Sequence, residues 1–335
     1  MNDSNARIKV IGVGRSGISV ANYMITSGLQ EAMFIAVGTD KKLLTEARIE
    51  HTILLATAPG EGLNANDAFD VGRQAAEEAL PAIKTVIGEA DLVFIVAGME
   101  DGTTNGAASV IAKAAKDAEV YLTVGVASAP FIWEGEQRAD GGLQAFIDAA
   151  DCAIVIPGDK WPRPFDAKNA DILRGTDEAL FYAVKDICDP ITRQDLIGLD
   201  LADVHAVLTE GNKALMGIGV ASGEHCARNA AIRAISCPHL SNSGIGNARG
   251  VFICITGNRD ITIEEIAEAS SIIQEAVHED AKTCFGVVFD DAAGKDIRVT
   301  VIASGYLEEP AGTATPIAAN REAFPDAGSS TESKG

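Results

Sequence analysis

Glycines are concentrated in the short segment that follows the first apolar run of this 335-residue chain. Residues 8–11 are typical of a buried strand, residues 12–17 contain three glycines, and residues 18–24 have the pattern of a helix. The first turn of a helix leaves backbone N–H groups unpaired, so a glycine-rich turn in front of it directs donors toward an anion. The segment predicts a phosphate or nucleotide site, although a packing turn without a ligand also fits it.

A second segment of the same kind lies further along the chain. Residues 91–97 are typical of a central parallel strand, residues 98–106 form a glycine-containing turn, and residues 107–118 fit a helix. Ligands of such sheets bind at the carboxyl ends of the strands. Two glycine segments at that edge therefore favour a nucleotide that is held from two sides.

A dinucleotide-binding enzyme is the alternative that the first segment leaves open. The segment satisfies GxGxxG, and Asp40 ends the next predicted strand, about 20 residues on, where an NAD-dependent oxidoreductase holds a ribose. This alternative explains nothing beyond Asp40.

Composition and charge exclude several classes of partner. The chain is 47% hydrophobic and carries a formal net charge of −21, so nucleic acid and anionic membrane surfaces are expected to repel it. Its six cysteines form no CxxC pair and its five histidines are scattered, which favours buried thiols in a reducing compartment over a disulfide or metal framework. A polar start and the lack of an apolar run of ~18 residues predict a cytoplasmic protein without direct membrane insertion.

Strand-like and helix-like runs alternate through the first half, which predicts an α/β fold with a doubly wound parallel sheet. Within it, residues 67–87 are helical, with Asp67 as a cap and Pro81 as a point of division. The second half has strand-like runs and two long helix-like stretches in a different order and predicts a smaller α/β domain. Its strand-like runs are residues 251–255, 284–289 and 297–303, and its long helix-like stretches are residues 223–235 and 263–278.

These motifs together resemble the bacterial tubulin homologue FtsZ. In the first half, IKVIGVG at residues 8–14, AVGTD at residues 36–40 and IPGDK at residues 156–160 are similar to motifs of that family. In the second half, MGIGVASGE at residues 216–224 and ARGVFICIT at residues 248–256 are similar as well. The likeness is collinear from about residue 7 to residue 306.

The resemblance implies a tubulin-like fold and a GTPase that polymerises head to tail. Its expected parts are a GTPase domain at residues 1–170, a central helix and synergy loop at 171–200, a C-terminal domain at 201–307 and a disordered tail at 308–335. GTP or GDP, with Mg²⁺, is the implied ligand, and the implied partner is another copy of the chain. A standard FtsZ or a membrane tether stays open as a further partner.

The same resemblance assigns roles to individual residues. The phosphates are assigned to residues of the two glycine segments, namely Gly14, Arg15, Ser16, Gly17, Gly98, Gly102, Thr103 and Gly106. The nucleoside is assigned to Glu134, Arg138 and Glu178, where Glu178 and its neighbour Asp177 equally fit a solvated helix face. Asp200 and Asp203 of a neighbouring subunit are assigned to the attacking water, whereas Asp203 also fits a simple helix cap.

Departures from the family pattern concentrate on the phosphate side. Arg15, Ser16 and Ile18 replace glycines of the first segment, and Glu100 and Asp101 replace glycines of the second. Two carboxylates repel a triphosphate unless a metal ion lies between them. We therefore expect slow GTP hydrolysis, and a structural polymer that binds or hydrolyses no nucleotide is the competing interpretation.

Overall fold

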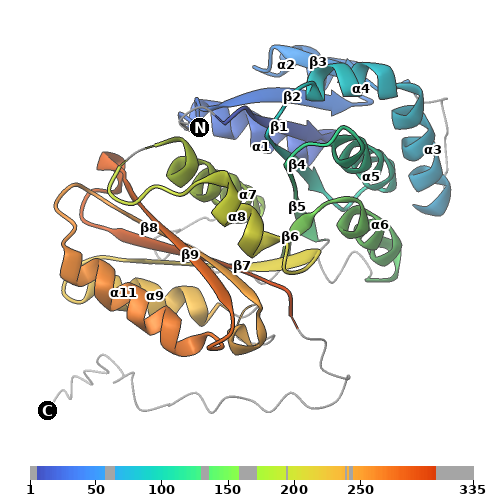
Figure 1. Ribbon diagram of the computed structural model, residues 1–335. Helices are drawn as coiled ribbons and strands as arrows, with labels where there is room; N and C mark the ends of the chain where they lie inside the picture. The colour runs from blue at the N-terminus through green and yellow to red at the C-terminus, as the bar shows by residue number, and fades with distance from the viewer. Residues whose placement is uncertain are drawn as a thin grey trace, which may run out of the picture.

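The computed structural model describes residues 6–56, 65–129, 136–157, 172–193, 195–237, 240 and 244–306. Glu134 and the expected tail lie outside these residues. Within the described part, ten strands form one sheet in the order β3-β2-β1-β4-β5-β6-β7-β10-β8-β9 (Figure 1). The sheet therefore runs without a break through both halves of the chain.

The N-terminal half of the sheet is parallel, from β3 through β6. Its strands are β1 Ile8–Val13, β2 Ala32–Gly38, β3 His51–Leu54, β4 Leu92–Gly98, β5 Leu122–Ala129 and β6 Cys152–Pro157. The strands β4 and β5 are buried almost throughout, because helices cover both faces of the sheet. All carboxyl ends lie at one edge, and the two glycine segments follow β1 and β4 there.

Two sets of helices form the layers on this half of the sheet. The helices α1 Gly14–Thr26, α2 Lys41–Glu46 and α7 Ile172–Thr192 share one apolar core with the sheet. The other core contains α3 Ala65–Glu78, α4 Leu80–Ile87, α5 Gly102–Asp117 and α6 Glu136–Ala149. This arrangement confirms the predicted doubly wound sheet.

The C-terminal half continues the same sheet with mixed strand directions. Its strands are β7 Lys213–Ala221, β8 Gly250–Gly257, β9 Lys282–Phe289 and β10 Ile297–Ser304. The strand β7 pairs in parallel with β6, β10 is antiparallel to β7 and β8, and β9 is parallel to β8. The helices α9 Cys226–Ile235 and α11 Ile263–Ala276 cover one face, and α8 Leu201–Leu208 packs on the other. The described residues also include two short 3₁₀ helices, Ile245–Asn247 and Asp291–Ala293.

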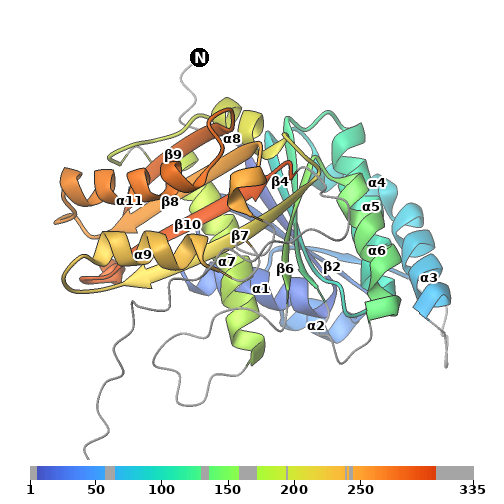
Figure 2. The same cartoon turned by 90° about the horizontal axis from the view of Figure 1, so that it is seen from below.

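The long helix α7 lies between the two halves (Figures 1 and 2). Its buried Asp186 accepts hydrogen bonds from Arg298, at 2.9 Å, and from Thr300, at 2.6 Å, both on β10. The Arg298 guanidinium also lies over the ring of Tyr182 on α7, 4.2 Å from its centroid. Because an unpaired buried charge is costly, these contacts fix α7 against the C-terminal half.

Several expected boundaries were wrong, each for a local reason. Helix α3 begins at Ala65, so Asp67 lies inside it rather than at its cap, whereas the predicted division near Pro81 is confirmed at the start of α4. Both glycine segments are shorter than expected, since α1 begins at Gly14 and α5 at Gly102. The strand β7 was not expected, because its glycines hide the apolar alternation.

Two further expectations concern membranes and thiols. No described helix is long and apolar enough to span a bilayer. All six cysteines are free, and five of them are buried. Burial raises the pKa of the Cys152 thiol to about 12, so this residue acts as a small core hydrophobe, as predicted.

Candidate nucleotide site

The N-terminus of α1 is open. Strand β1 ends at Val13, and Gly14 starts the helix with a φ of +70°, a conformation that glycine adopts without strain. The capping position, Val13, offers no side-chain hydrogen bond, and the first turn contains no acidic residue. The first backbone N–H groups of α1 are thus available to an anion, and the helix dipole favours one.

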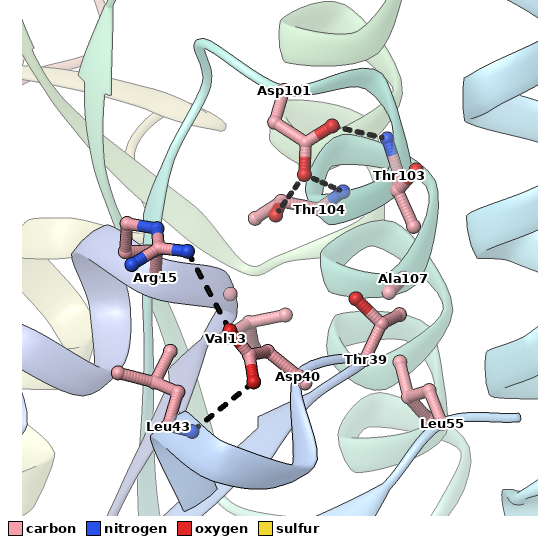
Figure 3. A pocket seen from close by; sticks show the side chains of 12 residues that line it. Val13, Arg15, Thr39, Asp40, Leu43, Leu55, Asp101, Thr103, Thr104 and Ala107 are labelled. Carbon is pink, nitrogen blue, oxygen red and sulfur yellow. Dashed lines mark hydrogen bonds and ion pairs between the residues drawn. The ribbon is translucent and has the colours of Figure 1, made fainter. Parts of the chain in front are cut away.

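The N-terminus of α5 is closed by its own capping residue. The carboxylate of Asp101 accepts hydrogen bonds from the backbone N–H groups of Thr103 and Thr104, each at 3.2 Å. It also accepts one from the Thr104 hydroxyl, at 2.8 Å (Figure 3). An anion at this helix end would have to replace the Asp101 carboxylate.

A pocket opens between the two helix ends at the carboxyl edge of the sheet (Figure 3). Its lining comes from β1 and α1, from the ends of β2 and β3, and from the first turns of α2 and α5. The residues are Val13, Gly14, Arg15, Gly38, Thr39, Asp40, Leu43, Leu55, Asp101, Thr103, Thr104 and Ala107. The mixture of apolar walls and a few polar groups is typical of a small-molecule site.

Arg15 and Asp40 face each other across the pocket, with 3.6 Å between Nη2 and Oδ2. Asp40 also caps α2 by accepting hydrogen bonds from the backbone of Lys42, at 2.9 Å, and Leu43, at 3.2 Å. Both partners are well exposed, so the ion pair contributes little stability and Arg15 can turn toward a ligand. Among the side chains that Figure 3 draws, Arg15 pairs with Asp40, whereas Asp101 is bonded to the start of α5.

Asp200 and Asp203 lie at the start of α8. Asp200 is the capping residue, and its carboxylate accepts a hydrogen bond of 2.9 Å from the backbone N–H of Asp203. The cap is therefore Asp200, not Asp203. Both side chains are exposed, so either can reach a neighbouring molecule.

The pocket and this acidic turn lie at opposite ends of the molecule. Arg193, just after α7, pairs at 3.4 Å with Glu31, which directly precedes β2. This contact places the end of α7 at the amino edge of the sheet, whereas the pocket is at the carboxyl edge. The acidic turn stays beside this end of α7, since the backbone N–H of Leu199 donates to the Pro190 carbonyl at 2.8 Å, and β7 then starts beside the first half of β6.

Comparison with known proteins identifies the family. Residues 7–165 match the family model "Tubulin/FtsZ family, GTPase domain", and residues 212–307 match "FtsZ family, C-terminal domain". An FtsZ structure from M. jannaschii, described as an empty dimer, is 31% identical with a TM-score of 0.80, over 90% of this chain and 88% of that one. The chain belongs to the tubulin/FtsZ family.

Two other relatives define the extent of this likeness. The cell division protein FtsZ of Magnetospirillum gryphiswaldense is 39% identical over 319 residues, which are 94% of this chain and 57% of that protein. The present chain thus corresponds to little more than half of that relative. A GTPγS-bound CetZ2 protofilament from Haloferax volcanii shares the fold, with a TM-score of 0.70 at 19% identity, over 90% of this chain and 93% of that one.

Because the chain belongs to the tubulin/FtsZ family, the alternative interpretation as an NAD-dependent oxidoreductase is wrong. The geometry agrees, because the Asp40 carboxylate is engaged with Arg15 and with the N-terminus of α2.

The residues that the FtsZ resemblance assigned to phosphates do not all line the pocket. Gly14, Arg15 and Thr103 do. A Cβ at Gly17 would overlap the carbonyl oxygen of Val96, and one at Gly106 would overlap that of Phe69. These two glycines permit close backbone contacts of α1 with β4 and of α5 with α3.

The three remaining residues of this set lie near the same helix ends. Gly98 ends β4, where an added Cβ would meet the side chains of Ser16 and Glu100. Gly102 is the first residue of α5. Ser16 is half-buried in the first turn of α1.

On the nucleoside side the structure describes one of the three assigned residues in full. Glu134 lies outside the described residues, and Arg138 is in α6 without a described side chain. Glu178 is half-buried on α7 and does not line the pocket. Burial raises the pKa of its carboxyl above the usual range, and the charge of Arg298 opposes this rise.

The described residues do not form a protein-only metal cage, and Mg²⁺ at a nucleotide would be held by phosphates with one or two carboxylates. Among the described residues, no group of three or more His, Cys, Asp or Glu side chains is arranged to hold a metal ion. Both oxygens of Asp101 already accept hydrogen bonds from the start of α5.

The sequence patterns missed Thr39 and Thr104 as pocket residues, because their placement depends on contacts between separate loops.

Proposed function

We propose that this chain binds GTP or GDP at the start of α1 and assembles head to tail into filaments. The supporting observation is the position of the open helix end and the exposed Asp200–Asp203 turn at opposite ends of one molecule. A contact between unlike surfaces repeats from copy to copy instead of closing into a dimer. The acidic turn of one copy then covers the pocket of the next.

Each part of this composite site has its own task. The backbone N–H groups at the start of α1 and the Arg15 guanidinium bind phosphate oxygens. The second segment, from Gly98 to Gly106, forms the other wall, and Glu134, Arg138 and Glu178 hold the nucleoside. Asp200 and Asp203 of the adjoining copy accept hydrogen bonds from the attacking water and orient it toward the terminal phosphate.

Hydrolysis is slow in this proposal. Phosphoryl transfer depends on positioning and on stabilisation of the charge that develops on the phosphate oxygens. Donors at the start of α5 would supply part of that stabilisation, but the Asp101 carboxylate occupies them. Fewer donors on the phosphates predict a lower rate.

The cellular setting follows from the relatives and is part of the proposal. The Magnetospirillum relative is described as a cell division protein, and we propose division or a related membrane process in the cytoplasm for this chain. We also propose the division of the chain at residues 170, 200 and 307. A standard FtsZ or a membrane tether fits as a further partner.

A structural filament without hydrolysis is the second candidate function. The self-capped start of α5 favours it, because that helix end needs no ligand to satisfy its donors. Filaments that form equally with and without nucleotide, and no phosphate release, would support this candidate.

The test combines sedimentation of filaments with phosphate release. Wild-type protein is expected to pellet with GTP and to release phosphate slowly. Asp203→Ala should still pellet with GTP, but its rate of phosphate release should be at least tenfold lower than that of wild type. Glu264→Gln, which changes an exposed carboxylate on α11, is the control and should match wild type. Loss of GTP binding at millimolar concentration would contradict the nucleotide site, and a protein that stays monomeric would contradict head-to-tail assembly.

A further inference from the structure

We propose that Asp195 is a positioning residue that holds the acidic turn, residues 200–203, in the place from which it acts on the next copy. This inference rests on the proposed function, because it concerns how that turn meets the site of a neighbouring subunit. Three features of the described residues carry it: the pairing of the segment before the turn with β9, the contact of that segment with the end of α7, and a hydrogen bond from β9 to the Asp195 carboxylate.

The segment before the acidic turn lies along the outer edge of β9, which is the last strand of the described sheet. Ile197 forms an antiparallel bridge with Val287 of β9. The backbone N–H of Val287 donates to the Ile197 carbonyl at 3.0 Å, and the N–H of Ile197 donates to the Val287 carbonyl at 3.4 Å. An edge strand has backbone groups without a strand partner, and this segment satisfies those of Val287.

The same segment is attached to the end of α7. The backbone N–H of Leu199, next to Asp200, donates to the carbonyl of Pro190 at 2.8 Å. The Pro190 ring itself lies close to β9, since a Cβ at Gly286 would be 2.7 Å from the Pro190 Cβ. The chain that leads into the acidic turn is thus held against two elements at once, α7 and β9.

Asp195 extends this pairing with its side chain. In the antiparallel register that the bridge sets, Asp195 is opposite Phe289, which presents its N–H on the same outer side of β9 as Val287. The Phe289 N–H donates to the Asp195 carboxylate at 3.1 Å. The side chain therefore supplies the acceptor that a backbone carbonyl supplies in a continued ladder, and it fixes the beginning of the segment on β9.

A small shift of the acidic turn affects hydrolysis more than assembly. Carboxylates that orient a water molecule depend on hydrogen bonds of defined length and direction, and a misplacement of about 1 Å costs up to about a hundredfold in rate. A contact between two subunits is spread over many residues and tolerates the same shift. Since Asp195 lies five residues before Asp200 and two backbone anchors remain between them, we expect an effect of about tenfold when its contact is lost.

The experiment measures phosphate release, filament sedimentation and amide hydrogen exchange for two changes at one position. Asp195→Ala removes the acceptor, whereas Asp195→Asn keeps an oxygen to which the Phe289 N–H can donate. We expect Asp195→Ala to lower kcat about tenfold, with KM for GTP and the amount of pelleted protein within about twofold of wild type. It should also speed exchange of the Val287 and Phe289 amides about tenfold, and Asp195→Asn should restore both kcat and exchange.

Asn22→Ala is the matched control. The Asn22 carboxamide oxygen accepts a hydrogen bond of 2.7 Å from the backbone N–H of Arg48 and so joins α1 to the segment after α2. This variant also loses a bond between a side chain and a distant backbone group, but in the N-terminal half. It should lower the melting temperature as Asp195→Ala does, and it should leave kcat and the exchange of the β9 amides unchanged.

Other outcomes overturn the inference in recognisable ways. An equal loss of kcat in Asp195→Ala and Asn22→Ala would give Asp195 a merely structural role. Failure of Asp195→Asn to restore kcat would mean that the charge acts, not the hydrogen bond. If wild type releases no phosphate, the proposed hydrolysis fails, and the inference is then decided by exchange alone: unchanged exchange of the Phe289 amide in Asp195→Ala contradicts it.

Discussion

The two glycine segments, residues 12–17 and 98–106, have similar sequence patterns, but the helices that follow them differ in whether their first backbone N–H groups are available. Each connects a buried parallel strand to a helix at the same edge of the sheet. Each also contains a glycine that allows a close backbone contact with another element, Gly17 in the first and Gly106 in the second. The first leads into a helix whose donors are open. The second leads into a helix whose donors are taken by Asp101.

This difference shows that a glycine-rich turn is not sufficient for a phosphate site. The helix dipole and the unpaired N–H groups exist at every helix start, but a local carboxylate competes for them with any ligand. The second segment has an aspartate one residue before its helix, and the first has a valine there. A single residue therefore decides which end stays available.

The largest expected effect comes from the packing glycine of the open segment. Gly17→Ala places a methyl group against the Val96 carbonyl and should lower the free energy of unfolding by about 3 kcal/mol, since a backbone contact cannot yield. Urea denaturation measures this change. Gly141→Ala is the control: it has open space and should stabilise α6 by about 0.5 kcal/mol. Equal effects of the two changes would contradict the packing role.

The contact between the two segments gives the next largest effect. Gly14→Ala combines a positive φ with overlap on Thr104 and should cost about 2 kcal/mol. In a double-mutant cycle, Thr104→Ala should recover about 1 kcal/mol of that cost, because it removes the overlapping atoms. Additive effects in the cycle would mean that the two helix ends do not touch.

Removal of the cap tests the closed segment directly. Asp101→Ala should lower the free energy of unfolding by about 1 kcal/mol, because two backbone donors at the start of α5 lose their acceptor. Added phosphate or GDP should restore part of the loss in thermal denaturation, since the donors then become available to an anion. An unchanged midpoint would show that Asp101 does not close this helix end.

Arg15 should have the smallest effect on stability. Arg15→Ala removes an exposed ion pair and should change the free energy of unfolding by less than about 0.5 kcal/mol. The same change should weaken GDP binding about tenfold, because a charge-assisted hydrogen bond to phosphate is lost. Arg259→Ala, an exposed pair on the far half, is the matched control and should leave GDP binding unchanged.

Much of the fold was predictable because its signals are local. Apolar runs such as residues 91–97 and 297–303 locate strands, and the structure places β4 and β10 over them. Motifs spread over both halves led to the correct family. The strand β7 was not predicted, because glycines alternate with its apolar residues. Both helices after the glycine segments start earlier than their sequence patterns indicate.

The sequence by itself determined the main buried strands, the alternation of strands and helices in the first half, the family, and which stretches face the carboxyl edge of the sheet. The tertiary structure alone decided that Asp101 turns back onto its own helix, that Arg15 faces Asp40, and that Gly17 serves packing. The reason is physical: periodicity and backbone preference act between near neighbours in the chain, whereas the direction of a side chain depends on groups that only folding brings within hydrogen-bond distance.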